Sequence, residues 1–370
     1  MKIAGIIAEY NPFHAGHAHH IAETRRRAGE CAVIAVMSGN FVQRGDCAVT
    51  DKWARARAAL EGGADLALEL PTVWAVSSAE HFARGAVSIL KAAGADTLSF
   101  GSESGGADAL ARAAQALDSP EFRAELRRHL DAGLPFARCR QLAAETLLGR
   151  SRAAVLENAN DNLGVEYLRA AWRLGWRPEV LAVPRIGAGH DDGAHPEYPS
   201  ASFLRKEIFE GRLPMDNPAG LRYNERGVLT ALRAMEPEDF AALPDCGEGL
   251  DRRLWQAVWQ AVSLDEVYDL AKTKRYAHAR IRRAVLWAAL GLRAADRPER
   301  PPYLRVLGAN ETGRAVLKQI PADIPVITKP AHGKGVPLME LEARCTDFFA
   351  LCRERALPCG EEWRRSPVIF

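Results

Sequence analysis

Four histidines lie within seven residues near the amino end of this 370-residue chain: His14, His17, His19 and His20. The preceding run, 3–8, is continuous and apolar, as expected of a buried parallel strand, and residues 16–29 have helical composition. The first two histidines therefore fall where a strand passes into a helix. In an open α/β sheet, ligands bind at the carboxyl ends of strands, and the next helix presents free N–H groups and a positive dipole end. Phosphate is the ligand that such a turn favours.

The sequence His14-Ala15-Gly16-His17 suits a nucleotide better than it suits packing. Gly16 lets a phosphate or an adenine ring approach the backbone, and imidazoles three residues apart can share one side of a helix. Each ring can donate a hydrogen bond to a phosphoryl oxygen, most strongly when protonated. Because nucleotidyl transfer needs mainly positioning and charge stabilisation, two such donors suffice without a covalent nucleophile. The sequence holds no Walker-type Gly-Lys-Ser/Thr motif.

Two alternatives stand beside this interpretation. One is capping or core packing, and His19 and His20, which lie deeper in the helix, are expected at the surface. The other is a zinc site built from all four rings, because imidazole is a common zinc ligand. No Cys or Glu stands among the four histidines, which weakens the zinc alternative.

The first hundred residues alternate between strands and helices. Strands are expected at 3–8, 32–37, 66–70 and 97–100, with helices from 17 onward, at 51–61 and at 77–93. Gly62-Gly63 and Gly94 stop two of the helices, and Pro71 closes a strand. This βαβαβαβ order predicts the α/β class with a doubly wound parallel sheet, a Rossmann-like fold.

Beyond the first hundred residues, helical sequence dominates 107–148. A further strand is expected at 180–183, then a Gly/His/Asp/Pro-rich loop at 187–199 and a helix at 202–209.

Past residue 215 the sequence changes to amphipathic helices, and Pro214, Asn217 and Pro218 mark a linker. A single core seldom grows beyond about 250 to 300 residues, which also favours two domains. We expect a catalytic domain at 1–215 followed by a mainly helical domain at 216–370.

Several polar or small residues stand at the ends of these elements. Gly101 ends a strand at the carboxyl edge, where it either admits a nucleotide or serves as an ordinary turn glycine. Asn160 lies in an Asn/Asp cluster that precedes a helix and is first of all typical of helix caps. Arg185 follows a strand-ending proline, with a surface salt bridge as its alternative role. Lys52 lies in the first turn of a helix, and position alone favours a solvated side chain.

Residues 200–205 read Ser-Ala-Ser-Phe-Leu-Arg and open a helix. The hydroxyls of Ser200 and Ser202 and the free N–H groups of a helix start can bind oxyanions, and Arg205 adds a fork of donors. An N-cap at this position is compatible with that role.

A run of six cations without an acid among them lies near residue 280: Lys272, Lys274, Arg275, Arg280, Arg282 and Arg283. A solvated helix face is the default for such a run, but its charge can also neutralise several phosphates. Tyr276, within the run, would be available for stacking on a base. We favour RNA contact here, and residues 25–27, all arginine, could extend the same surface.

The composition is that of an ordinary intracellular enzyme, with 48% hydrophobic residues and a formal charge of +2. That charge implies a local nucleic-acid patch rather than a basic surface overall. No apolar stretch approaches the roughly 20 residues that span a bilayer, and no signal peptide precedes the first strand, so we expect a cytoplasmic protein. Seven cysteines, an odd number, favour reduced thiols.

Longer motifs extend the short one around Gly16. His14-Ala15-Gly16-His17 resembles the His-x-Gly-His signature of the adenylyl-transferring superfamily that includes class I aminoacyl-tRNA synthetases, and 200–205 resembles its second phosphate signature. Other matching stretches are Ala-Glu-Tyr-Asn-Pro-Phe-His at 8–14, Val-Met-Ser-Gly-Asn-Phe-Val-Gln-Arg-Gly at 36–45, Asp-Lys-Trp-Ala-Arg at 51–55, Leu-Glu-Leu-Pro at 68–71, Phe-Gly-Ser-Glu at 100–103 and Lys-Thr-Lys-Arg-Tyr at 272–276. Together they are similar to the tRNA(Met) cytidine acetate ligase family.

This resemblance implies a site and a reaction. His14, His17 and Lys52 would be catalytic, with Lys52 on a helix that forms part of the active-site wall. ATP would contact Ile7, Ala8, Glu9, Tyr10, Asn11, Pro12, Phe13, His14, Gly16, His17, His20, Gly101, Asn160, Arg185, Ser200, Ser202 and Arg205. The family implies that acetate becomes an acetyl-adenylate, with Mg²⁺ neutralising the pyrophosphate, and that the acetyl group passes to N4 of the wobble cytidine of elongator tRNA(Met).

The residues themselves indicate only nucleotidyl transfer near RNA. A small-molecule adenylyltransferase and a non-catalytic RNA-binding protein on the same fold remain alternatives.

Overall fold

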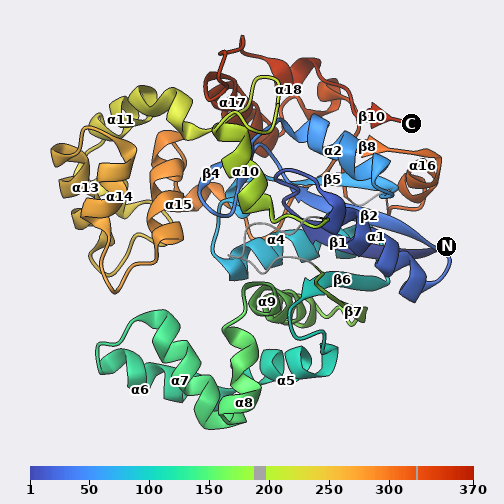
Figure 1. Cartoon of the computed structure of the whole chain (residues 1–370), viewed down its shortest axis with the longest axis horizontal. Coiled ribbons are helices and arrows are strands. Elements are labelled where there is room, and N and C mark those ends of the chain that lie inside the picture. Colours follow the sequence, from blue (N-terminus) through green and yellow to red (C-terminus); the bar gives the residue numbers. More distant parts are fainter. Residues whose placement is uncertain (187–196, 322–323) are drawn as a thin grey trace.

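The computed structural model describes residues 1–186, 197–321 and 324–370, so most of the loop expected at 187–199 lies outside it. Five strands of its main sheet run parallel: β1 (Lys2–Ala8), β2 (Cys31–Ser38), β5 (Leu66–Leu70), β6 (Thr97–Ser102) and β7 (Glu179–Pro184). Their order across the sheet is β5-β2-β1-β6-β7, with β1 near the middle (Figure 1). The predicted doubly wound sheet is confirmed.

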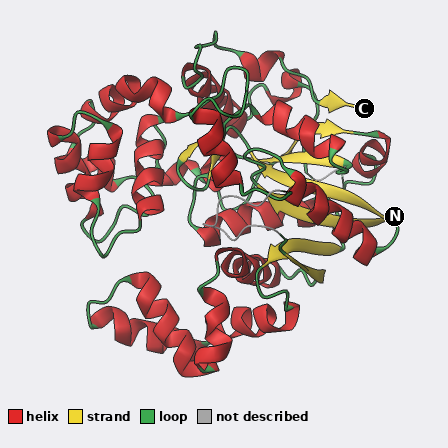
Figure 2. Cartoon of the chain, viewed as in Figure 1, coloured by secondary structure: helices red, strands yellow, loops and turns green. Residues whose placement is uncertain are grey.

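Helices cover both faces of this sheet (Figure 2). One face packs against α1 (Ala15–Ala28) and α2 (Lys52–Glu61), through residues such as Ile21 and Trp53. The other face packs against α4 (Ala79–Ala92) and α9 (Ala159–Arg173), with the short α3 (Thr72–Ala75) beside them. Because both faces are buried, β2 is apolar along nearly its whole length and all eight of its residues are buried.

Two groups of helices extend beyond the sheet. The first, below α9 in Figure 1, confirms the helical sequence expected at 107–148 and comprises α5 (Ala107–Leu117), α6 (Pro120–Asp131), α7 (Phe136–Leu148) and α8 (Arg150–Ala153). The second, at the left, comprises α11 (Glu225–Arg233), α12 (Pro237–Ala241), α13 (Leu250–Gln260), α14 (Leu264–Ala271) and α15 (His278–Ala289). The helix expected at 202–209 is α10 (Ala201–Phe209).

The carboxy-terminal third returns to the sheet, which its helical character did not predict. Strand β8 (Leu304–Ala309) pairs antiparallel with β5, and β10 (Val368–Ile369) and β9 (Val326–Ile327) pair parallel with β8. Helices α16 (Glu311–Leu317), α17 (Pro337–Leu351) and α18 (Glu361–Arg364) lie around this edge. Residues after 215 are therefore mainly helical but also complete the sheet, and the boundary at 215/216 stays a prediction.

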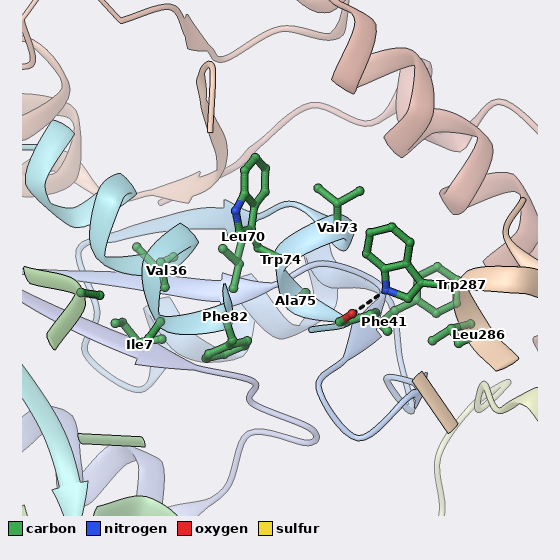
Figure 3. Close-up of a cluster of buried hydrophobic side chains, with 14 of the residues drawn as sticks. Ile7, Val36, Phe41, Leu70, Val73, Trp74, Ala75, Phe82, Leu286 and Trp287 are labelled. Carbon is green, nitrogen blue, oxygen red and sulfur yellow. Dashed lines mark hydrogen bonds between the residues drawn. The ribbon is translucent and has the colours of Figure 1, made fainter. Parts of the chain in front are cut away.

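The last turn of α15 is held against the sheet by a tryptophan. Trp287 is fully buried, and its indole Nε1 donates a hydrogen bond of 2.5 Å to the carbonyl oxygen of Val76. Figure 3 shows its ring beside Val73 and Phe41, in the same cluster as Leu70 at the end of β5. This anchor fixes where the basic residues of α15 lie relative to the carboxyl edge of the sheet.

No helix in the described parts of the chain is both long and apolar enough to cross a membrane.

Candidate active site

A cleft of about 480 Å³ opens at the carboxyl ends of β1, β6 and β7. Every residue expected to contact ATP lines it, except Pro12 and Phe13. Phe13 instead packs behind the site, with its ring centroid 5.5 Å from that of His17 and 5.0 Å from that of Tyr10. The fold thus gathers nearly all of the predicted nucleotide site in one place, although the contact with ATP itself stays a prediction.

The start of α1 fixes the orientation of both imidazoles. His14 is the N-cap residue, and its Nδ1 accepts a hydrogen bond of 3.1 Å from the backbone N–H of Gly16. The Nδ1 of His17 accepts one of 3.2 Å from the backbone N–H of His14. The two rings stack, with centroids 3.8 Å apart and planes 29° apart. Because each Nδ1 is an acceptor, a neutral ring carries its proton on Nε2, where it can donate.

Burial keeps these rings uncharged. It lowers the pKa of His14 to about 4, with Arg185 and Arg205 contributing, and lowers that of His17 well below its ordinary value, with His14 adding to the effect. The rings are therefore available as neutral Nε2–H donors and not in the protonated form that would donate most strongly. Positive charge in the cleft comes from its arginines.

His20 lines the cleft, as the family resemblance implies and contrary to the surface position expected from its depth in the helix. Its Nε2 lies 3.0 Å from the hydroxyl oxygen of Ser99 in β6, and that oxygen lies 2.6 Å from the hydroxyl of Thr24. Burial lowers the pKa of His20, and together with the charges of His19 and Arg185 it brings that pKa to about 4. His20 thus ties α1 to the sheet beside the phosphate turn.

The beginning of α10 docks onto the loop after β1. Arg205 donates from Nη1 to the carbonyl oxygen of Asn11 at 2.7 Å and from Nη2 to the hydroxyl of Ser202 at 3.0 Å. The hydroxyl of Ser200 accepts from the backbone N–H of Phe203 at 3.1 Å, so the predicted N-cap is confirmed. The second motif therefore faces the first across the cleft.

Arg185, just beyond the end of β7, completes the cationic side. Its backbone N–H donates to the carbonyl oxygen of Ser102 at 3.0 Å, and its side chain is exposed at the cleft. The guanidinium lies close enough to His14, His17 and His20 to lower the pKa of all three. An anion placed between these groups would meet Arg185 directly.

Gly101 and Asn160 lie together at the far wall. A Cβ on Gly101 would meet only the Cγ of Arg185, at 3.6 Å, so the protein itself does not require glycine there. Asn160 donates from Nδ2 to Glu103 at 2.6 Å and does not cap its helix. The buried Asp161, next along the helix, fixes the turn after β6, because its carboxylate accepts hydrogen bonds of 3.1 Å from the backbone N–H groups of Glu103 and Ser104.

A hairpin that the sequence did not predict adds to the cleft. Its strands, β3 (Phe41–Val42) and β4 (Asp46–Cys47), have two residues each and leave no periodic signal. Its turn brings Gln43 and Arg44 to the cleft wall, and the backbone N–H of Gln43 donates to the Oε1 of Glu9 at 2.7 Å. The family motif at 36–45 includes most of this segment, but the order of apolar and polar residues did not predict a hairpin.

Two arginines position this wall. Arg283, assigned to RNA contact, also lines the cleft and donates from Nη1 to the carbonyl oxygen of Gln43 at 3.3 Å. The backbone of α15 approaches the turn so closely that a Cβ on Gly45 would lie 2.5 Å from the backbone of Arg282. The buried Arg55 of α2 donates to the carbonyl oxygens of Glu9 at 2.7 Å and Ser38 at 3.1 Å, which joins the ends of β1 and β2.

Lys52 is not brought to the site, and it is not solvated either. Its side chain is fully buried, with Nζ 2.7 Å from Glu69 Oε1 and 2.6 Å from Glu362 Oε2, and it does not line the cleft. Burial by itself lowers the pKa of Lys52, but Glu362 and Glu69 together raise it above its ordinary value. The first turn of α2 points this side chain into the interior between β5 and α18, which explains why the catalytic assignment is not supported.

The basic run divides into two parts. Lys272, Lys274 and Arg275 are exposed in the segment between α14 and α15. Arg280 is engaged by the carbonyl oxygen of Asp245 at 2.6 Å and by Glu248 at 3.0 Å. Arg282 lies 3.8 Å from Asp46 beside the hairpin, and Arg283 faces the cleft.

Two expectations about this basic surface are wrong. The ring of Tyr276 is buried, and its hydroxyl donates to the carbonyl oxygen of Glu248 at 2.6 Å, so it is not available for stacking. Residues 25–27 do not extend the surface, because α1 and α15 lie on opposite sides of the molecule (Figure 1). Arg25 pairs with Asp65 at 2.6 Å, and its two neighbours pair with Glu23.

The arrangement of the possible metal ligands and of the cysteines was also compared with the sequence-based expectations. Within the described parts of the chain, no group of three or more His, Cys, Asp or Glu side chains is arranged to hold a metal ion. All seven cysteines are free, and all but Cys359 are buried.

This arrangement, a doubly wound sheet with His-x-Gly-His at the end of its first strand, defines a nucleotidyl transferase, and the model of the family described as HIGH Nucleotidyl Transferase matches residues 1–361. A "tRNA(Met) cytidine acetate ligase" of Clostridium perfringens is 34% identical over 402 residues, covering 100% of both chains, and one of Alkaliphilus metalliredigens is 34% identical, covering 98% and 97%. The chain belongs to the tRNA(Met) cytidine acetate ligase family and is therefore an enzyme.

Solved structures agree with this membership. The crystal structure of Thermotoga maritima TmcAL bound with alpha-thio ATP superposes with a TM-score of 0.91 at 29% identity, covering both chains completely. The apo form of the same protein gives a TM-score of 0.90 at 30% identity, again with complete coverage of both chains.

Proposed function

We propose that this protein is an ATP-dependent ligase that acetylates N4 of the wobble cytidine of elongator tRNA(Met). In the first step a carboxylate oxygen of acetate attacks the α-phosphorus of ATP, and pyrophosphate leaves as the acetyl-adenylate forms. In the second step the cytidine amine attacks the acetyl carbon, AMP leaves, and the nitrogen loses a proton to give N4-acetylcytidine. No covalent enzyme intermediate is needed, so the free cysteines take no part.

The observation that carries the proposal is the paired, neutral imidazoles of His14 and His17 at the start of α1. With both Nδ1 atoms engaged by backbone N–H groups, the Nε2–H groups are preset as donors for phosphoryl oxygens. Such fixed donors stabilise the charge that develops in the transition state at no cost of reorganisation. Arg185 and Arg205 supply the positive charge that the neutral rings lack.

The cleft also offers one carboxylate to the metal that usually accompanies ATP. Glu9 is the single carboxylate among the described residues that line it, so the protein offers no all-protein cage. Mg²⁺ is commonly held by one or two carboxylates together with substrate phosphates, and Glu9 would be the protein's contribution. When bound, the ion would neutralise charge on the pyrophosphate.

The placement of Arg283 supports an RNA substrate for the same site. It lies at the cleft wall on a helix whose preceding segment carries three exposed cations, Lys272, Lys274 and Arg275. A polyanion bound along this segment would extend along α15 to the nucleotide cleft. A small-molecule adenylyltransferase would need no such approach.

The complete reaction is tested by incubating the protein with ATP, isotopically labelled acetate and unmodified elongator tRNA(Met), followed by mass spectrometry of the tRNA nucleosides. We expect heavy N4-acetylcytidine. Labelled acetate that becomes adenylate but never enters tRNA would contradict the second step, and absence of any adenylate would contradict the first.

The first step has its own test in the variant His17→Ala. Loss of one preorganised donor typically lowers such rates by about 100- to 1,000-fold, so we expect a fall of that size in acetate-dependent ATP–pyrophosphate exchange. Retention of tRNA should stay within twofold of the unmodified protein. His332→Ala, at an exposed position, serves as the matched control, and exchange that survives the loss of His17 would refute the role.

A further inference from the structure

A second hollow, of about 520 Å³, lies beside the exposed cations of the 272–276 segment. Its lining comes from this segment and from α13: Gly249, Arg252, Arg253, Gln256, Thr273, Lys274, Arg275 and Tyr276. Four of these residues carry positive charge and none carries negative charge. The hollow is therefore a strongly cationic depression that the nucleotide site does not use.

The solvent face of α13 continues this hollow. Arg252, Gln256 and Trp259 are exposed and follow one another at the spacing i, i+4 and i+7, which places them on one side of the helix. The opposite side, with Leu250 and Leu254, is buried in the core. One helix thus presents a cation, an amide and an indole in a row.

Trp259 is unusual because so large an apolar side chain is 67% exposed. Its ring is nevertheless held, because Trp255 one turn earlier packs against it edge to face, with centroids 5.9 Å apart. A supported, exposed indole beside cations is a platform on which a base can stack, since every base offers a flat π-face.

We propose that this face of α13 and the adjoining hollow form a second RNA-contact surface of the enzyme, on which Trp259 stacks against an unpaired base of the substrate tRNA. Arg252, Arg253, Lys274 and Arg275 contact the phosphates on either side of that base. Trp259 takes the stacking role that the buried Tyr276 cannot fill. This inference rests on the proposed function, because it assumes a tRNA substrate.

Charge favours RNA over a protein partner at this surface. An apolar protein contact would not need the cations of the hollow, whereas phosphates pair with them directly. Two acids of the same region are already engaged: Glu248 by Arg280 at 3.0 Å, and Glu266 by the backbone N–H of Val262 at 2.8 Å.

The surface is also continuous with the active site. Helix α15 begins just after Tyr276 at the hollow and carries Arg283 to the cleft wall. At about 1.5 Å per residue, the seven residues from 276 to 283 span roughly 10 Å. An RNA that lies in the hollow can therefore continue along α15 toward the cleft.

The experiment measures the Kd of unmodified elongator tRNA(Met) for Trp259→Ala, Trp259→Phe and Arg252→Gln over a series of salt concentrations. We expect Trp259→Ala to raise Kd by about 5- to 150-fold, the equivalent of the roughly 1–3 kcal/mol of one stacked base, and Trp259→Phe to keep most of the affinity. Arg252→Gln should reduce the slope of log Kd against log salt by about 1. Acetate-dependent ATP–pyrophosphate exchange should be unchanged in all three.

Matched controls come from the separate helical group: Phe136→Ala on α7, where the side chain is 51% exposed, and Arg128→Gln on α6. Neither should change Kd. Unchanged tRNA affinity in Trp259→Ala and Arg252→Gln overturns the inference. Loss of exchange together with affinity also overturns it, because the effect would then be structural. Failure of the unmodified protein to bind or acetylate tRNA would instead count against the proposed function.

Discussion

Gly16 controls where the His14 ring lies. A Cβ at this position would lie 3.0 Å from Cε1 and 3.1 Å from Nδ1 of His14, closer than ordinary van der Waals contact allows. The same ring accepts the backbone N–H of Gly16, so ring and glycine are fixed against each other. Glycine is needed here for the position of an imidazole, in addition to the open approach that it gives a phosphate.

The variant Gly16→Ala tests this requirement. We expect acetate-dependent ATP–pyrophosphate exchange to fall by about 10- to 100-fold, because displacement by a fraction of an ångström weakens a preorganised donor. Thermal stability should stay the same or rise slightly, since alanine favours a helix by roughly 0.5–1 kcal/mol over glycine. Gly247→Ala, where an added Cβ would touch nothing within 4 Å, is the control. Exchange at the unmodified rate would show that the ring tolerates the methyl group.

At the scale of elements, Lys52 joins three parts of the chain. Its ammonium group bridges Glu69 of β5 and Glu362 of α18, and Glu362 also accepts the hydroxyl of Thr346 in α17 at 2.9 Å. All of these side chains are buried. This cluster fastens α2 and the carboxy-terminal helices to one strand.

Removal of this charge should loosen the junction of these elements. In Lys52→Met the carboxylate of Glu69 would remain buried without the cation that it pairs with, and Glu362 would keep only Arg305, at 3.5 Å. Breaking such a buried pair typically costs about 3–5 kcal/mol. Urea denaturation should show a loss of that size in the free energy of unfolding, whereas Lys334→Met, at an exposed lysine, should change it by less than about 0.5 kcal/mol. Equal effects of the two substitutions would mean that the cluster contributes nothing.

The strands that position the nucleotide site could be predicted from the sequence because they are largely apolar and alternate with helical segments, and glycine or proline marks several of the boundaries. The hairpin β3–β4 and strand β8 could not. The first is too short for periodicity, and the second lies among helices and contains the charged Arg305, which is buried against Glu362. The places of Lys52 and Tyr276 depend on Glu362 and Glu248, partners that only the folded chain supplies.

At the scale of the whole molecule, the neutral histidines make stability depend on pH. The pKa of His14 and of His20 is about 4 in the folded protein, against about 6.5 in the unfolded chain. Between these values the unfolded chain holds more protons, so the free energy of unfolding falls as pH is lowered from about 6.5 to 4. Burial raises the pKa of Glu342 to about 8, which acts in the opposite sense between about 4.5 and 8.

The histidine contribution can be isolated with His20→Gln. We expect the slope of unfolding free energy against pH between 4 and 6.5 to decrease by at most one proton, about 1.4 kcal/mol per pH unit. Because Glu342 is present in both proteins, its opposing effect cancels in the comparison. Denaturation by urea at pH 5 and pH 7 measures the difference, with His332→Gln as control. An unaltered slope would mean that His20 is charged in the native state.

Strand β5 has β2 on one side and β8 on the other, although β8 is encoded more than two hundred residues later. A ribosome that adds about 5–20 residues per second needs roughly 10 to 50 s to cover that distance. During this time the growing polypeptide displays the bare edge of an apolar strand, a template for unwanted pairing. A chain truncated before residue 304 would consequently be an aggregation-prone fragment and not a smaller active enzyme.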